Sequence, residues 1–456
     1  IKYWDIGQGS YLTDGKAGMS SGKSVTERLF SFFARANYSY QDKYMLSASI
    51  RHEGSSKFAA DNRWANFWSA TAGWRISNEE FMKDFDWLDD LKIRFGYGVT
   101  GNNDFSATYM ANMLSSDTNW MMPNGTWAYS YGKSQNVNPN LGWEEKKEWN
   151  LGVDYSFFEG RLYGKFDYYR REVDNLLFSV KVPQPPYTQG SQMQNIGSME
   201  SKGWEFEVGG DIIRTKDFTW SSSMNLSHNT GKILTLEGDN SYHNGNGFVA
   251  PGTPGDAARM EAGSTIGSFY MWKFAGFDDE GSFLLYNKDG EVIPAAQKTE
   301  NDKQYIGNYT PKLIIGWSHT LTYKNFDLGI NLRSWIDFDV FNTINMYYGL
   351  SEVAGQNVLR NAYIDNRHIK EVKQLCDYWL EDGTFLKIDA ISLGYSLNMK
   401  KWQKYIDKID LYLTVRNVAC FTKYSGLNPE VNVNGLDPGY EWFNNIYPET
   451  RRYTFG

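Results

Sequence analysis

Three glycines that stand close together are the first residues whose spacing is typical of a chemical site. Gly96, Gly98 and Gly101 in the stretch GYGVTGNN satisfy the G-x-G-x-x-G pattern of dinucleotide-binding turns. Such a site needs a helix that begins at the glycines and an acidic residue about twenty positions later. Here the glycines alternate along an apolar strand pattern from Leu91 to Thr100 and lead into an Asn-rich loop. We therefore expect small residues on the inner side of a strand.

A second candidate is a calcium-binding loop near the end of the sequence. The stretch EVNVNGLDPGYE places Glu430, Asn432, Asn434 and Glu441 at the offsets of calcium ligands in an EF-hand loop. Glu430 stands where that motif usually has Asp, and the neighbouring prolines do not suit the flanking helices. The alternative is an Asn/Gly turn in an exposed loop. We expect no other cofactor.

Signals for catalysis are weak elsewhere in the sequence. The five histidines lie far apart, and none has a partner at metal-ligand spacing. Glu144 and Glu145 imitate the paired carboxylates of glycoside hydrolases, but adjacency in sequence is weak evidence for that chemistry. The zinc-protease motif H-E-x-x-H does not occur. The sequence therefore predicts a protein that is not an enzyme.

Aromatic side chains in the longer loops are more informative. Flat rings suit the C–H faces of sugars, and they suit the side chains of peptides equally well. Packing between loops, or contact with a partner protein, is the alternative interpretation. The candidate substrate-binding residues are Trp120, Trp127, Tyr129, Tyr131, Tyr347, Tyr348 and Trp442.

The elements that must position these loops are strands, because apolar and polar residues alternate along most of the chain. About thirteen segments follow this pattern. They run over residues 29–40, 44–52, 64–76, 91–100, 143–158, 161–178, 202–213, 218–229, 311–324, 326–338, 384–397 and 409–419, with a last one starting near 450. Many are longer than ordinary globular strands and approach the roughly 9–11 residues that cross a bilayer.

The hairpin from Pro311 to Phe338 shows the pattern most clearly. One row, Leu313, Ile315, Trp317, Leu321 and Tyr323, should face lipid, and a second row, Ser318, Thr320, Asn331 and Arg333, should face a polar lumen. Short connections alternate with long ones, as periplasmic turns and extracellular loops do in outer-membrane barrels. The long loops cover residues 101–142, 179–201, 231–308, 339–383 and 421–449.

Composition agrees with a membrane barrel of the all-β class. Phe, Trp and Tyr make up 16% of the residues, which suits aromatic girdles, and no apolar run is long enough for a spanning helix. The formal net charge of −8 argues against a nucleic-acid partner. Cys376 and Cys420 form no metal or redox motif, and a disulfide between them is left open.

Two details of the strand pattern need an explanation. In the segment after Gly383, Phe385, Lys387 and Asp389 share parity with Ile391, so two charges would begin a lipid-facing row. A bulge near Ala390, or a start outside the bilayer, would remove this conflict. Thirteen is also an odd number, and open sheet edges are costly in lipid, so we expect these strands to form part of a larger barrel.

Several stretches resemble the SusC/RagA family of TonB-dependent outer-membrane transporters of Bacteroidota. They include residues 34–58 (ARANYSYQDKYMLSASIRHEGSSKF), 91–104 (LKIRFGYGVTGNND), 305–330 (YIGNYTPKLIIGWSHTLTYKNFDLGI) and 383–397 (GTFLKIDAISLGYSL). The resemblance implies a 22-strand barrel of which residues 1–456 form the C-terminal strands. The plug and TonB box of the family have no counterpart here.

The resemblance also implies a function and partners. Members of the family import oligosaccharides or oligopeptides through the outer membrane beneath a SusD-like surface lipoprotein that acts as a lid. TonB drives this transport through the N-terminal part of the transporter. The alternatives are a passive channel or adhesin barrel and a soluble β-rich glycan-binding protein.

Overall fold

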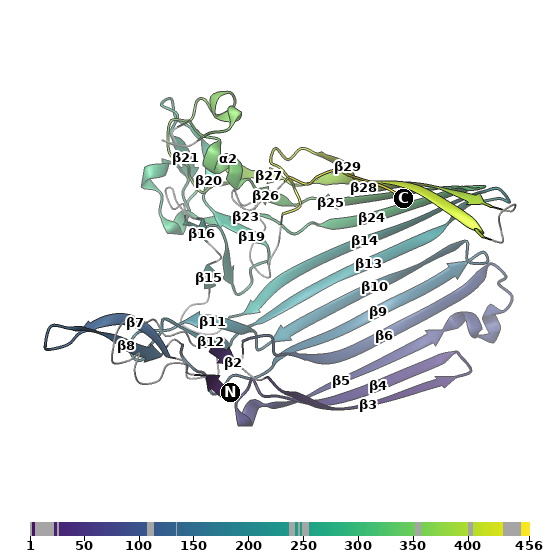
Figure 1. The fold of residues 1–456 in the computed structure, drawn as a ribbon, viewed down its shortest axis with the longest axis horizontal. Coiled ribbons are helices and arrows are strands. Elements are labelled where there is room, and N and C mark those ends of the chain that lie inside the picture. Colours follow the sequence, from purple (N-terminus) through teal and green to yellow (C-terminus); the bar gives the residue numbers. More distant parts are fainter. Residues whose placement is uncertain are drawn as a thin grey trace.

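The computed structural model shows a chain that is almost entirely β-structure, built around one large antiparallel sheet (Figure 1). It describes residues 2–4, 22–24, 27–106, 114–133, 135–236, 242–244, 247–248, 255–351, 357–399, 405–431 and 448–456. The thirteen strands of the sheet, in spatial order, are β3 (Leu29–Tyr40), β4 (Tyr44–Ser55), β5 (Trp64–Arg75), β6 (Leu88–Asn102), β9 (Glu144–Phe157), β10 (Leu162–Asp174), β13 (Ser198–Arg214), β14 (Phe218–Thr235), β24 (Leu313–Tyr323), β25 (Phe326–Ile336), β28 (Phe385–Asn398), β29 (Lys408–Thr422) and β30 (Arg452–Phe455).

The remaining elements belong to the connections and lie mostly at one end of the sheet (Figure 1). The paired strands are β1 (Lys2–Trp4) with β2 (Gly22–Ser24), β7 (Leu114–Met121) with β8 (Trp127–Lys133), β11 (Leu177–Lys181) with β12 (Ser191–Asn195), β15 (Tyr242–Asn244) with β18 (Arg259–Glu261), β16 (Gly247–Phe248) with β17 (Gly255–Asp256), β19 (Ser268–Met271) with β23 (Gln304–Asn308), β26 (Asp339–Phe341) with β27 (Leu380–Asp382), and the meander β20 (Lys273–Phe277), β21 (Phe283–Tyr286) and β22 (Val292–Pro294). The described α-helix is α2 (Thr343–Tyr348), and short 3-10 turns occupy 60–62, 76–78, 80–82, 295–297, 300–302, 360–363 and 377–379. Among the described residues, no helix has the length and apolar character needed to span a bilayer, a finding with no bearing on strands.

Each strand of the sheet pairs with its neighbours in the chain, as the alternation of long and short connections predicts. The tightest turn joins β24 to β25, where Tyr323 pairs with Phe326 across two residues. Lys324 in this turn has a φ of 52°, the left-handed conformation that such turns require. All the short turns lie at the end of the sheet opposite the long loops (Figure 1). This end is therefore the periplasmic end.

The two faces of the sheet differ as the hairpin pattern predicts. Trp68, Phe95, Trp317 and Leu393 are large apolar side chains on one face, and all are exposed. The other face carries the charged and small polar residues described below. The apolar face is the lipid-facing face, because hydrocarbon replaces water around it in the membrane.

One periplasmic turn fixes its aromatic residues with a carboxylate. The Oε1 atom of Glu79 accepts hydrogen bonds from Tyr44 Oη at 2.7 Å and from Trp74 Nε1 at 3.0 Å. Its Oε2 atom accepts from Lys43 Nζ at 3.1 Å. These donors, the Tyr44 hydroxyl first, lower the pKa of Glu79 to about 2. Two 3-10 turns, 76–78 and 80–82, form this connection.

We expect Glu79→Gln to lower the temperature at which the barrel loses its compact form. Because the folded pKa of about 2 lies below the unfolded value, the contribution of Glu79 is present above the unfolded pKa and is lost as pH falls through about 2. The difference between parent and variant should therefore be full at about pH 7 and vanish in strong acid. Heat-modifiable migration in detergent gels measures it. An equal difference at every pH would contradict this explanation.

Candidate functional site

Ion pairs fix the inner face of the sheet in its first half. Arg94 on β6 donates from Nε and Nη2 to the two carboxylate oxygens of Asp154, both at 2.8 Å, and from Nη2 to Asp167 at 3.1 Å. Gly152 lies between these groups, and a Cβ there would collide with the guanidinium. The strand glycine therefore makes room for a cation that ties β6, β9 and β10 together.

The prediction that the glycine-rich stretch belongs to a strand of the sheet is confirmed. Gly96 lines a hollow of about 530 Å³ on this face, together with Lys92, Arg94 and small polar side chains. Gly98 lies against Ser69, and Gly101 lies under the Phe67 ring so closely that a Cβ would overlap the ring. No helix starts there, since β6 continues to Asn102. The three glycines therefore form no dinucleotide-binding turn.

The predicted bulge near Ala390 is also confirmed. Asn331 pairs with Ala390 and Leu332 pairs with Ile388, so Asp389 is an extra residue in β28. The extra residue shifts the parity of the strand. Lys387 therefore shares the inner face with Arg333, its partner in register, and not the row of Ile391.

Beside this bulge, charged side chains tie the last long loop to the inner face. Arg333 donates to both oxygens of Asp389, at 3.0 and 3.1 Å, and also to Glu430. Lys387 Nζ donates to Glu430 at 2.8 Å and to Glu449 at 2.6 Å. The Lys387 side chain is only 6% exposed. The five side chains form one network, named here the β28 charge network.

This network bears on the predicted calcium loop. Two cationic side chains surround Glu430, so they take the place beside its carboxylate that a metal ion would need. The other predicted ligands, Asn432, Asn434 and Glu441, lie outside the described residues. In the part of the chain that the structure describes, no group of three His, Cys, Asp or Glu side chains has the geometry of a metal site. The calcium site stays a prediction, and Glu430 has a different role in this structure.

The long loops between β14 and β24 and between β25 and β28 fold together into one compact unit outside the sheet (Figure 1). We call this unit, residues 257–309, 339–351 and 357–382, the loop module. Its core contains fully buried Phe269, Met271, Phe283 and Trp379. Cys376 is buried there as a free thiol, and Cys420 on β29 is also free, so the disulfide left open by the sequence is absent.

Two predicted substrate-binding residues lie in this loop module. Tyr347 is 3% exposed and belongs to the core, and burial raises the pKa of its hydroxyl to about 12. The ammonium group of Lys373 lies 4.5 Å from the centre of its ring. Tyr348 is half-buried and packs against the same core. For Tyr347 the structure contradicts a ligand-contacting role, because its ring is covered, and packing between loops describes both tyrosines.

The first long loop presents a separate hairpin, β7–β8, which extends away from the sheet (Figure 1). It contains the predicted residues Trp120, Trp127, Tyr129 and Tyr131, and its backbone register pairs Trp120 with Ala128 and Met121 with Trp127. The hairpin therefore carries these four residues at the extracellular end, with Trp120 in the row of Ala128 and Trp127 in the row of Met121. Trp442, the remaining predicted residue, lies outside the described residues.

Comparison with known proteins decides the family. Residues 3–418 match the family described as "TonB dependent receptor-like, beta-barrel". The chain belongs to this family. This TonB-dependent receptor barrel is an outer-membrane protein whose strands form an antiparallel transmembrane barrel wall.

Similar proteins place it closer to one branch of the family. The chain is 32% identical to TonB-dependent receptor SusC of Bacteroides thetaiotaomicron over 97% of its length and 45% of that protein. It is 30% identical to TonB-dependent receptor P3 of Formosa agariphila, over 94% of its length and 45% of that protein. A solved structure of the RagAB peptide importer is similar with a TM-score of 0.80 at 25% identity, over 97% of this chain and 50% of that one. The chain thus spans about half the length of the relatives it matches, and its resemblance to the SusC/RagA family is confirmed.

Proposed function

We propose that this chain forms the C-terminal part of a barrel that imports oligosaccharides or oligopeptides in a TonB-dependent manner. One observation carries the proposal: the β28 charge network and the Arg94 ion pairs line the inner face, which is the face that a solute meets inside a barrel. The likeness to SusC and to a peptide importer supports import as the activity. Further strands of the transporter, with a plug and a TonB box, complete the barrel.

The extracellular end suits a partner and a polymeric substrate. The loop module offers a folded surface outside the sheet, and the β7–β8 hairpin carries four aromatic residues at the extracellular end. In our proposal a SusD-like lipoprotein docks on the module, and Trp120 and Trp127 contact sugar rings or peptide side chains. No catalytic step is part of this mechanism.

The deciding experiment measures uptake by the full-length transporter in strains with and without TonB. We expect energised uptake to be lost without TonB, because passive flow through a plugged barrel is negligible. Uptake that continues unchanged would favour a passive channel. With TonB present, replacing Trp120 and Trp127 by alanine should weaken capture about tenfold or more, at about 1–3 kcal/mol for lost stacking. A panel of oligosaccharides and oligopeptides then identifies the substrate class.

A further inference from the structure

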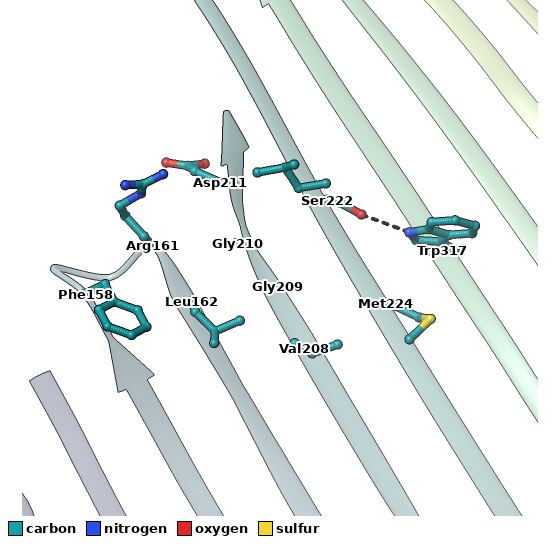
Figure 2. Close-up of a pocket in the computed structure, with 11 residues that line it drawn as sticks. Phe158, Arg161, Leu162, Val208, Gly209, Gly210, Asp211, Ser222, Met224 and Trp317 are labelled. Carbon is teal, nitrogen blue, oxygen red and sulfur yellow. Dashed lines mark hydrogen bonds between the residues drawn. The ribbon is translucent and has the colours of Figure 1, made fainter. Parts of the chain in front are cut away.

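A hollow lies on the lipid-facing side of the sheet, between β10 and β24 (Figure 2). Its volume is about 450 Å³. Leu162, Val208, Met224 and Trp317 form its sides, and Gly210 lies in its floor beside Ser222. These strands are central in the sheet, well away from its edge strands β3 and β30. The hollow is therefore a feature of the finished barrel wall.

The sequence makes the hollow by placing two small residues side by side on the outer face. Gly210 pairs with Leu162 on one side and with Ser222 on the other. A Cβ at Gly210 would meet the Arg161 carbonyl oxygen, so the backbone itself forms the floor. Ser222 Oγ accepts a hydrogen bond from Trp317 Nε1 at 2.8 Å, which satisfies both polar groups (Figure 2). The surface left to a ligand is therefore mainly apolar.

Charge is found only at the periplasmic end of the hollow. Arg161 follows the short turn after β9, and its exposed guanidinium has no ion pair or hydrogen bond among the described residues. Asp211 also lines the hollow, but its carboxylate accepts from Ser221 Oγ at 2.6 Å and pairs with Arg214 at 3.6 Å. As far as the described residues show, the Arg161 cation is therefore unpaired where the apolar wall meets the periplasm.

We propose that this hollow binds one phospholipid of the periplasmic leaflet, with an acyl chain against Gly210 and the phosphate at Arg161. The order of groups in the site, an apolar floor inside the membrane and a free cation at its boundary, matches the order of groups in such a lipid. An acyl chain fills a depression that neighbouring side chains leave open. The lipid at this place is bound, and is not exchanged as freely as the lipid along the rest of the barrel.

The first test uses a variant whose larger side chain fills the hollow and leaves the hydrogen bond between Trp317 and Ser222 in place. Val208→Trp on β13 occupies the space, and Val153→Trp on β9 is the matched control, because both valines are half-buried on the outer face. The full-length transporter is purified in detergent, and its binding of dioleoyl phosphatidylglycerol is measured by native mass spectrometry. We expect one retained lipid on the parent and on Val153→Trp, and about tenfold weaker binding on Val208→Trp.

A second pair of variants tests the cation. Arg161→Gln should weaken phosphatidylglycerol binding severalfold, while Lys83→Gln, which removes an exposed cation in another periplasmic turn, should not. Heat-modifiable gel migration confirms that each variant is folded. Equal retention by Val208→Trp and Val153→Trp would overturn the proposal, and so would a parent that retains lipid A in preference to phospholipid. Neither outcome depends on transport, so the proposed import is tested separately.

Discussion

Replacing Trp379 with alanine is expected to unfold the loop module while the membrane sheet stays intact. Trp379 is fully buried, and its ring packs against Phe283 and Tyr378 at centroid distances of 6.2 and 4.7 Å. Truncation of a buried tryptophan costs about 3–5 kcal/mol. Its Nε1 also donates to the carbonyl oxygen of Gln374 at 3.0 Å, and a buried carbonyl left without a donor adds about 1–3 kcal/mol. This total is large for a unit held by one core.

Hydrogen exchange of the full-length transporter measures the effect. Amides of β20 and β21 should lose protection in Trp379→Ala, because these strands contribute to the same core. Protection of β24 and β25 should persist. Val372→Ala is the matched control, since Val372 lies in the same loop but is 64% exposed, and its loss should cost no more than about 0.5 kcal/mol. Equal protection in both variants would show that Trp379 does not hold the module together.

Partner binding by the same two variants adds a functional measurement. If the proposed lipoprotein docks on the loop module, Trp379→Ala should lose it and Val372→Ala should keep it. Retention by both variants would place the docking surface elsewhere.

The strands of the sheet could be predicted because the residue pattern that specifies each strand lies within that strand and its adjoining turns. Alternation with a period of two and short turns specify most hairpins, and residues 29–40 were predicted as the strand β3 with the observed bounds. Errors arose where a strand leaves the bilayer. β14 was predicted to end at Asn229 but continues to Thr235, because backbone pairing with β13 persists beyond Asn229, where Ile233 is fully buried. Periodicity disappears there, although the hydrogen bonds do not.

The loops could not be predicted in the same way, because their structure depends on residues far apart in sequence. The core of the loop module combines Phe269 and Met271 from one loop with Trp379 from another, and neither loop has a periodic pattern of its own. An aromatic residue in a loop therefore gives no sign of whether it packs or binds, as Tyr347 shows. One long-range feature did have a local signal: the charge of Lys387 in an apolar row indicated the bulge at Asp389.

That lysine also carries the second large expected effect, which is the release of the last long loop from the inner face. Lys387→Met keeps the length of the side chain but removes the cation that lies between Glu430 and Glu449. An exposed ion pair contributes up to about 1 kcal/mol, and breaking a buried one costs about 3–5 kcal/mol. The Lys387 side chain is 6% exposed and that of Glu449 is 46% exposed, so we expect about 3 kcal/mol, between these limits.

Proteolysis and hydrogen exchange over residues 421–431 report this release, because the loop should open while β28 and β29 stay paired. Lys165→Met is the matched control: Lys165 pairs with Glu207 at 3.2 Å on the same face, but its side chain is 49% exposed, so the cost should stay below about 1 kcal/mol. Adding Glu449→Gln to Lys387→Met should recover part of the loss, since it removes one of the two carboxylates left to repel each other. If the free-energy costs of Lys387→Met and Glu449→Gln simply add in the double variant, Lys387 holds the loop by packing alone. The charges of the β28 charge network would then contribute nothing to holding the loop.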